Sequence, residues 1–130
     1  YDGFLTRLPD WKSTVIIRIP IDPLEPGRQI WTYYTHMAMP DGTSLVDAAF
    51  PPGTYDAPVK TGTLLGKMGN YSGTPGNPTG VHLHLSIVKD DGTGSFKNEL
   101  DINNTLDPSP YFGFNLNKHN QTDALPGCAR

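Results

Sequence analysis

Two histidines separated by one residue are the part of this sequence best suited to chemistry. Between residues 80 and 87, three polar side chains alternate with apolar ones: His82, His84 and Ser86 against Val81, Leu83, Leu85 and Ile87. A period of two is typical of a half-buried β-strand whose apolar face covers a core. The two imidazoles would then project from the opposite face, about 6.5–7 Å apart at about 3.3 Å per residue. That spacing suits one ring that binds a metal and a neighbour that acts on the metal's substrate, although many such pairs are structural.

His36 is the third candidate, because it ends a second strand-like stretch from residue 29 to 37. If this strand lies next to the one that carries His82 and His84, three imidazoles could form a zinc or general-base site. The alternative is that His36 caps the strand end and hydrogen-bonds to backbone. The fourth histidine, His119, is expected to be a solvated tail residue.

Other catalytic patterns are missing from the sequence. It has no His-Glu-x-x-His helix motif, no Gly-x-Ser-x-Gly elbow and no phosphate-binding glycine loop. The single cysteine, Cys128, can form neither an internal disulfide nor a zinc-thiolate cluster. Asp107, which precedes Pro108, is expected to be a turn or cap residue.

The composition favours a small all-β domain. The chain of 130 residues contains 14 glycines and 13 prolines, which indicates many turns between short strands. A net charge of −3 and a pI of about 5.7 give no basic surface for nucleic acid. No apolar stretch approaches the roughly 18 residues of a membrane span.

The elements that must position the histidines follow from local composition. β-Branched and aromatic residues predict strands over residues 13–19 and 29–37, with Ile30, Thr32, Tyr34 and His36 on one face. A turn and a short strand are expected over 58–69, then a Gly- and Pro-rich loop over 70–80 that could border a binding cleft. A turn over 89–94 and a brief helical piece near Asp107 follow. We expect one domain over residues 1–113 and a polar tail over 114–130.

Three segments together resemble the lysostaphin/LytM-type zinc endopeptidases. That family has a Tyr-x-His element, a segment of the form Val-x-x-Gly-x-x-Ile-Gly-x-x-Gly, and then His-x-His. Here Tyr34-Thr35-His36, Val59 to Gly69 (with Leu65 in place of Ile) and His82-Leu83-His84 follow in the same order. Asp2-Gly3-Phe4 is similar to the Asp-Gly turn that precedes the family's central strands.

The resemblance implies an all-β core with long Gly/Pro-rich loops, one zinc ion and a peptidoglycan peptide as substrate, in a secreted or cell-envelope protein. It implies that His84 is a zinc ligand and that His36 and His82 are the general-base or polarising pair. Tyr34, Asn70 and Tyr71 border the expected cleft and are candidate substrate-binding residues.

The family's two remaining zinc ligands come from a His-x-x-x-Asp motif upstream of the Asp-Gly turn. With that turn at Asp2, the motif would precede residue 1, so we expect an N-terminally incomplete domain that binds zinc only when the upstream His and Asp are present. A missing N-terminal segment or a protein partner would complete the fold. The alternatives are a non-catalytic module that binds cell-wall peptide, glycan or a protein, and a structural domain of an extracellular assembly.

Overall fold

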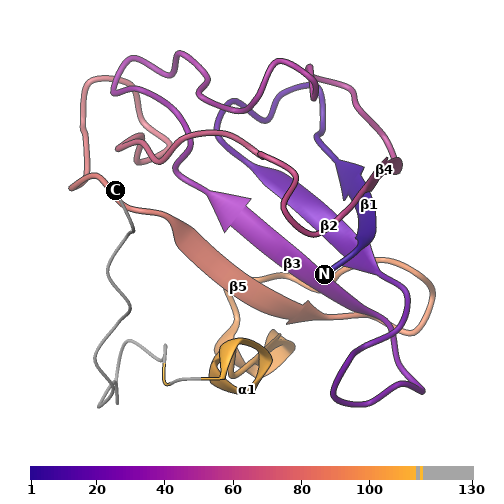
Figure 1. The fold of residues 1–130 in the computed structure, drawn as a ribbon. Helices are drawn as coiled ribbons and strands as arrows, with labels where there is room; N and C mark the ends of the chain where they lie inside the picture. The colour runs from indigo at the N-terminus through magenta and orange to yellow at the C-terminus, as the bar shows by residue number, and fades with distance from the viewer. Residues whose placement is uncertain (114, 116–130) are drawn as a thin grey trace.

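The computed structural model describes residues 1–113 and 115. Apart from Asn115, the expected tail, with His119 and Cys128, lies outside the described residues. Six strands form one antiparallel sheet in the order β4-β1-β2-β3-β5-β6 (Figure 1). The strands are β1 (Gly3–Thr6), β2 (Val15–Ile19), β3 (Ile30–Thr35), β4 (Ala57–Val59), β5 (His84–Lys89) and β6 (Thr105–Leu106). The all-β prediction is confirmed.

Helical structure in the described residues is limited to two short pieces. A 3-10 turn, η1, covers Ile102–Asn104, and one helical turn, α1, covers Ser109–Phe112. The helical piece expected near Asp107 is therefore present. In Figure 1 the long loops between β3 and β5 gather at the end of the sheet where β3 ends, while α1 lies beyond β5, away from those loops. No helix in the described part of the chain is long and apolar enough to cross a membrane.

The central strands form where β-branched and aromatic residues concentrate, as expected. β2 pairs with β3 in a register that places Val15 opposite Tyr34 and Ile19 opposite Ile30. β3 in turn pairs with β5, with Thr35 opposite His84. The strand that ends near His36 and the strand that carries His84 are therefore neighbours, which is the arrangement a three-histidine site requires.

The larger core covers one face of the sheet. It joins alternate strand residues to side chains from the loops and from α1: Leu5, Val15, Ile17, Ile19, Ile30, Met37, Val46, Phe50, Val59, Ile87 and Tyr111. The buried guanidinium of Arg7 fastens the loops at one edge of this core. It donates to the carbonyl of Phe50 at 2.8 Å, to that of Trp11 at 2.9 Å and to Ser44 Oγ at 3.0 Å. Burial lowers the pKa of Arg7.

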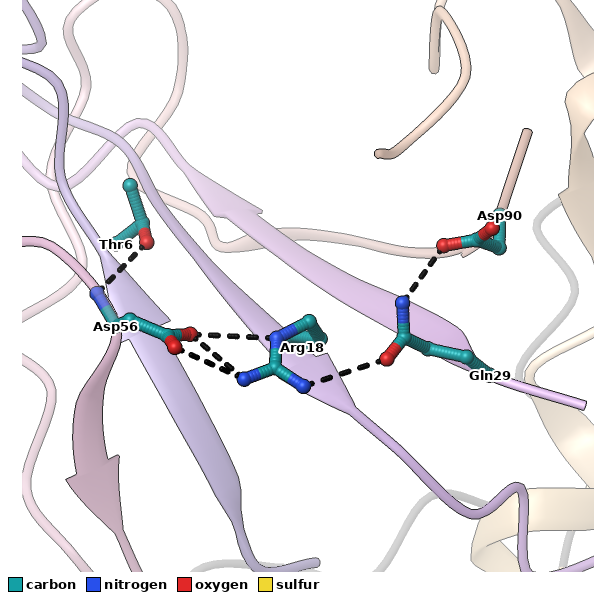
Figure 2. A network of polar contacts seen from close by, with 5 residues as sticks. All are labelled: Thr6, Arg18, Gln29, Asp56 and Asp90. Carbon is teal, nitrogen blue, oxygen red and sulfur yellow. Dashed lines mark hydrogen bonds and ion pairs between the residues drawn. The ribbon is translucent and has the colours of Figure 1, made fainter. Parts of the chain in front are cut away.

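The opposite face carries a smaller aromatic core and a polar belt. Ile16, Trp31 and Val88 are buried there beneath the partly exposed rings of Trp11, Tyr33 and Phe96. Figure 2 shows the belt, in which Arg18 donates to both carboxylate oxygens of Asp56 at 2.9 Å, and Gln29 links Arg18 to Asp90. These residues come from β2 or lie at the ends of β3, β4 and β5, so the belt connects strands from β4 to β5 across the sheet.

Two strand predictions need correction. β5 begins at His84 rather than near Gly80, and Val81 and Leu83 are 67% and 40% exposed instead of facing a core. The reason is that β3 ends at Thr35, opposite His84, so the preceding residues have no strand partner there. They pair with a loop instead, through a bridge between Gly69 and His82. The short strand expected after a turn within residues 58–69 is replaced by isolated bridges at Gly66 and Gly69, while β4 lies before the turn.

Candidate functional site: a histidine cluster where β3 ends

The three candidate histidines lie together at the end of the sheet where β3 ends and β5 begins. The ring centroids of His36 and His82 are 4.5 Å apart, and those of His36 and His84 are 6.0 Å apart. The sequence alone did not determine whether the three rings would lie close together, and in the structure they do. The alternative interpretation of His36 also holds, because its ring hydrogen-bonds to a backbone carbonyl.

His36 reaches its neighbours through an unusual backbone conformation. Strict alternation would place it on the face of Tyr34, whereas His84 lies opposite Thr35 on the other face. β3 ends at Thr35, and His36 has a φ of 71°, in the left-handed region that side chains other than glycine rarely adopt. This turn breaks the alternation and brings the His36 ring toward His82 and His84.

Gly69 makes the close packing of this cluster possible. The carbonyl of Gly69 accepts a hydrogen bond from the His82 N–H at 3.1 Å, while Asn70 N–H donates to the carbonyl of Ala38 at 3.0 Å. A Cβ at Gly69 would lie 2.1 Å from the Ala38 oxygen and 2.7 Å from the His36 oxygen. Only glycine fits between the two segments that carry His36 and His82.

Backbone carbonyls fix the proton position on two of the rings. His36 Nδ1 lies 2.6 Å from the carbonyl oxygen of Tyr71, and His82 Nδ1 lies 2.7 Å from that of Gly80. A carbonyl can only accept, so each neutral ring carries its proton on Nδ1 and its lone pair on Nε2. Two imidazoles held in this tautomer are proton acceptors suited to general-base chemistry.

His84 has a different environment, on the Tyr33 face of the sheet. Its Nε2 lies 3.0 Å from Ser86 Oγ and 3.7 Å from the Glu99 carboxylate. The Tyr33 ring approaches it edge-on, with centroids 6.5 Å apart. Burial raises the pKa of Tyr33, and the negative charge of Glu99 raises it further.

The three candidate substrate-binding residues occupy unlike positions. Tyr34 packs against the larger core, and burial raises its pKa. Tyr71 is buried, and its carbonyl anchors His36 while its hydroxyl donates to the Gly73 carbonyl at 3.0 Å. Asn70 is half-buried, and its carbonyl accepts from the Thr79 N–H at 2.9 Å. Tyr71 thus contacts the histidine cluster directly, through its backbone.

The described residues do not complete a metal site. Within residues 1–113 and 115, no group of three His, Cys, Asp or Glu side chains is arranged to hold a metal ion. Zinc sites use three or four protein ligands. A zinc site that includes His84 would therefore need ligands from outside these residues.

Comparisons of the chain with protein-family models, with curated proteins and with solved structures found no match. The function is therefore inferred from the geometry of the cluster and from the resemblance of its motifs.

Sequence reasoning missed two residues of the site. Glu99 lies in an irregular segment after β5, where no periodicity connects it to His84. Gly69 belongs to the glycine-rich middle motif. A glycine in that motif, shortly before the histidine pair, was the sequence signal for a close approach between two backbone segments.

Proposed function

We propose that the histidine cluster is part of a zinc-dependent endopeptidase site that hydrolyses peptide bonds in peptidoglycan cross-links or stems. The observation that carries this proposal is the approach of His36 to His82, with both Nδ1 atoms anchored to carbonyls. The order of the Tyr-x-His, glycine-rich and His-x-His motifs supports it. Such a protein would act as a secreted or cell-envelope enzyme.

The roles of the residues follow from their proton positions. One of the two Nε2 lone pairs of His36 and His82 would take a proton from the attacking water, and the protonated ring would return it to the leaving amine. The other ring, once protonated, would stabilise the negative charge that develops on the carbonyl oxygen. His84 would be a zinc ligand, its partner ligands being outside the described residues. Tyr71 would hold His36 and Asn70 would border the substrate, whereas Tyr34 packs against the larger core and would support the cluster from the other face of the sheet.

A non-catalytic module that binds cell-wall peptide or glycan is the second candidate. It is favoured by the finding that no three-ligand group exists within residues 1–113 and 115. The two candidates differ in whether the bound peptide is cut.

The test is to incubate the chain, extended at its N-terminus by the segment expected to carry the remaining His and Asp ligands, with purified peptidoglycan, with added zinc and after chelation. New amino groups and released peptides are measured by mass spectrometry. We expect zinc-dependent cleavage that falls by about 10²–10⁴-fold in His36→Gln and His82→Gln, because each removes a positioned proton acceptor. Lys60→Gln, at an exposed position beside β4, is the matched control.

Cleavage that His36→Gln and His82→Gln leave unchanged would contradict the proposed roles. Co-sedimentation with peptidoglycan without cleavage, in the presence of zinc, would instead favour the binding module.

A further inference from the structure

Glu99 is a largely buried carboxylate that the proposed reaction does not use. Its side chain is 12% exposed, and Oε2 lies 3.7 Å from Nε2 of His84, whose side chain is 45% exposed. A carboxylate that leaves water at this depth needs a polar partner to offset the lost hydration. The imidazole of His84 is such a partner, and it belongs to the cluster.

The atoms around Nε2 of His84 select a proton position. Ser86 Oγ, at 3.0 Å, can either donate or accept and therefore does not decide it. The ionised carboxylate of Glu99 can only accept, and its charge favours a hydrogen on the nitrogen that faces it. The strand register places Tyr33 on the same face of the sheet as His84. Burial raises the pKa of Tyr33, and the charge of Glu99 raises it further.

We propose that Glu99 is a positioning residue that holds the neutral His84 ring with its proton on Nε2. His84 would then be the opposite tautomer to His36 and His82, whose carbonyl partners hold the proton on Nδ1. The lone pair of His84 would lie on Nδ1. Carboxylates that orient a functional imidazole in this way act on its tautomer, its ring orientation and its basicity.

The tautomers can be read directly by nuclear magnetic resonance. The full chain, labelled with ¹⁵N, is studied at pH about 8.5, where imidazoles of ordinary pKa are neutral. Correlations between the protons on ring carbons and the ring nitrogens distinguish the protonated nitrogen from the one with the lone pair. We expect Nε2–H for His84 and Nδ1–H for His36 and His82, which serve as internal references.

Variants distinguish the effect of Glu99 on the His84 tautomer from that of Ser86. Glu99→Gln keeps the shape but supplies an amide that can also donate, so the His84 tautomers should become a mixture while His36 and His82 stay unchanged. Glu25→Gln, at an exposed glutamate, is the control. Ser86→Ala should keep His84 as Nε2–H, because the carboxylate remains.

Three results would overturn the proposal: Nδ1–H at His84 in the unmodified chain, an unchanged tautomer in Glu99→Gln, or loss of Nε2–H in Ser86→Ala. Because Ser86→Ala retains Glu99, it tests the proposal even if Glu99→Gln does not fold.

The functional consequence rests on the proposed function, and the two can fail separately. If the chain cleaves peptidoglycan, Glu99→Gln should lower the apparent zinc affinity measured in that assay by about 10–100-fold, as for other residues that support a ligand. The tautomer measurement requires neither metal nor catalysis. If the expected tautomers are found but no cleavage occurs, only the proposed endopeptidase function is overturned.

Discussion

At His36, a single backbone angle determines whether the imidazole reaches the other histidines. In an extended strand, its ring would follow Tyr34 to the face of the larger core. A φ of 71° turns it toward His82, and the Tyr71 carbonyl then holds its Nδ1 at 2.6 Å. Residues other than glycine occupy this region at a cost of about 1–2 kcal/mol, so the surrounding contacts must compensate for it.

Replacing His36 by glycine and by alanine should expose this cost. Both variants lose the imidazole, but alanine keeps the unfavourable left-handed conformation whereas glycine does not. We expect His36→Gly to have a free energy of unfolding about 1 kcal/mol higher than that of His36→Ala, measured by urea denaturation.

The same comparison at Thr35, the last residue of β3, is the matched control. There the alanine variant should be the more stable, because glycine in a strand loses more conformational entropy on folding. An alanine advantage at both positions would mean that the left-handed conformation of His36 carries no cost.

At the scale of the elements, a buried carboxylate fastens the loop between β2 and β3 to α1. Asp22 is fully buried, and its Oδ2 accepts hydrogen bonds from Arg28 and, at 2.9 Å, from the Tyr111 hydroxyl. Its Oδ1 accepts from the Leu24 N–H at 2.9 Å. Burial pushes the pKa of Asp22 upward, but these hydrogen bonds outweigh it, and the pKa is lowered.

The lowered pKa of Asp22 should affect acid unfolding. The ionised Asp22 stabilises the fold at pH values above the unfolded-state pKa of about 3.9, and that stabilisation is lost as the pH falls through the lower folded-state value. We therefore expect the free energy of unfolding of Asp22→Asn to fall less steeply than that of the unmodified chain below pH about 4.

Calorimetry or urea denaturation between pH 7 and about 2.5 measures this slope. Asp10→Asn, at an exposed position, should leave it unchanged. Identical slopes for Asp22→Asn and the unmodified chain would show that Asp22 is not linked to acid unfolding.

Across the whole molecule, the two ends of the sheet carry different groups of side chains. The long loops between β3 and β5 lie at the end of the sheet where β3 stops (Figure 1), and the His36 and His82 rings meet there. The Asp22 cluster instead joins the β2–β3 loop to α1 through the Tyr111 hydroxyl. The belt of Arg18, Gln29, Asp56 and Asp90 crosses the sheet between its edges (Figure 2). The frame is thus tied by polar contacts away from the histidines.

The close contact of Gly69 with the Ala38 backbone holds together the two segments that carry His36 and His82. Gly69→Ala would drive a methyl group into the Ala38 carbonyl, so it should lower the free energy of unfolding by about 1–3 kcal/mol. It should also separate His36 from His82, which loss of cross-relaxation between their ring protons would report. Gly27→Ala, where a Cβ meets nothing within 4 Å, is the control and should change stability by less than about 0.5 kcal/mol. An equally small change at Gly69 would mean that the segments can move apart without cost.

The central strands of the sheet could be predicted from local composition. β2 and β3 appeared where expected, because β-branched and aromatic residues favour strands whatever their partners. The three histidines and the glycine-rich segment were recognisable as candidates from residue type and order alone.

The site itself depended on long-range contacts. Where β3 ends decides that β5 starts at His84 and that Val81 and Leu83 face solvent, and no local pattern encodes that limit. The left-handed turn at His36 and the approach of Glu99 to His84 also arise from segments that meet only in the folded chain. Periodicity reports which face a side chain prefers within one strand, whereas the juxtaposition of side chains is set by packing between segments far apart in sequence.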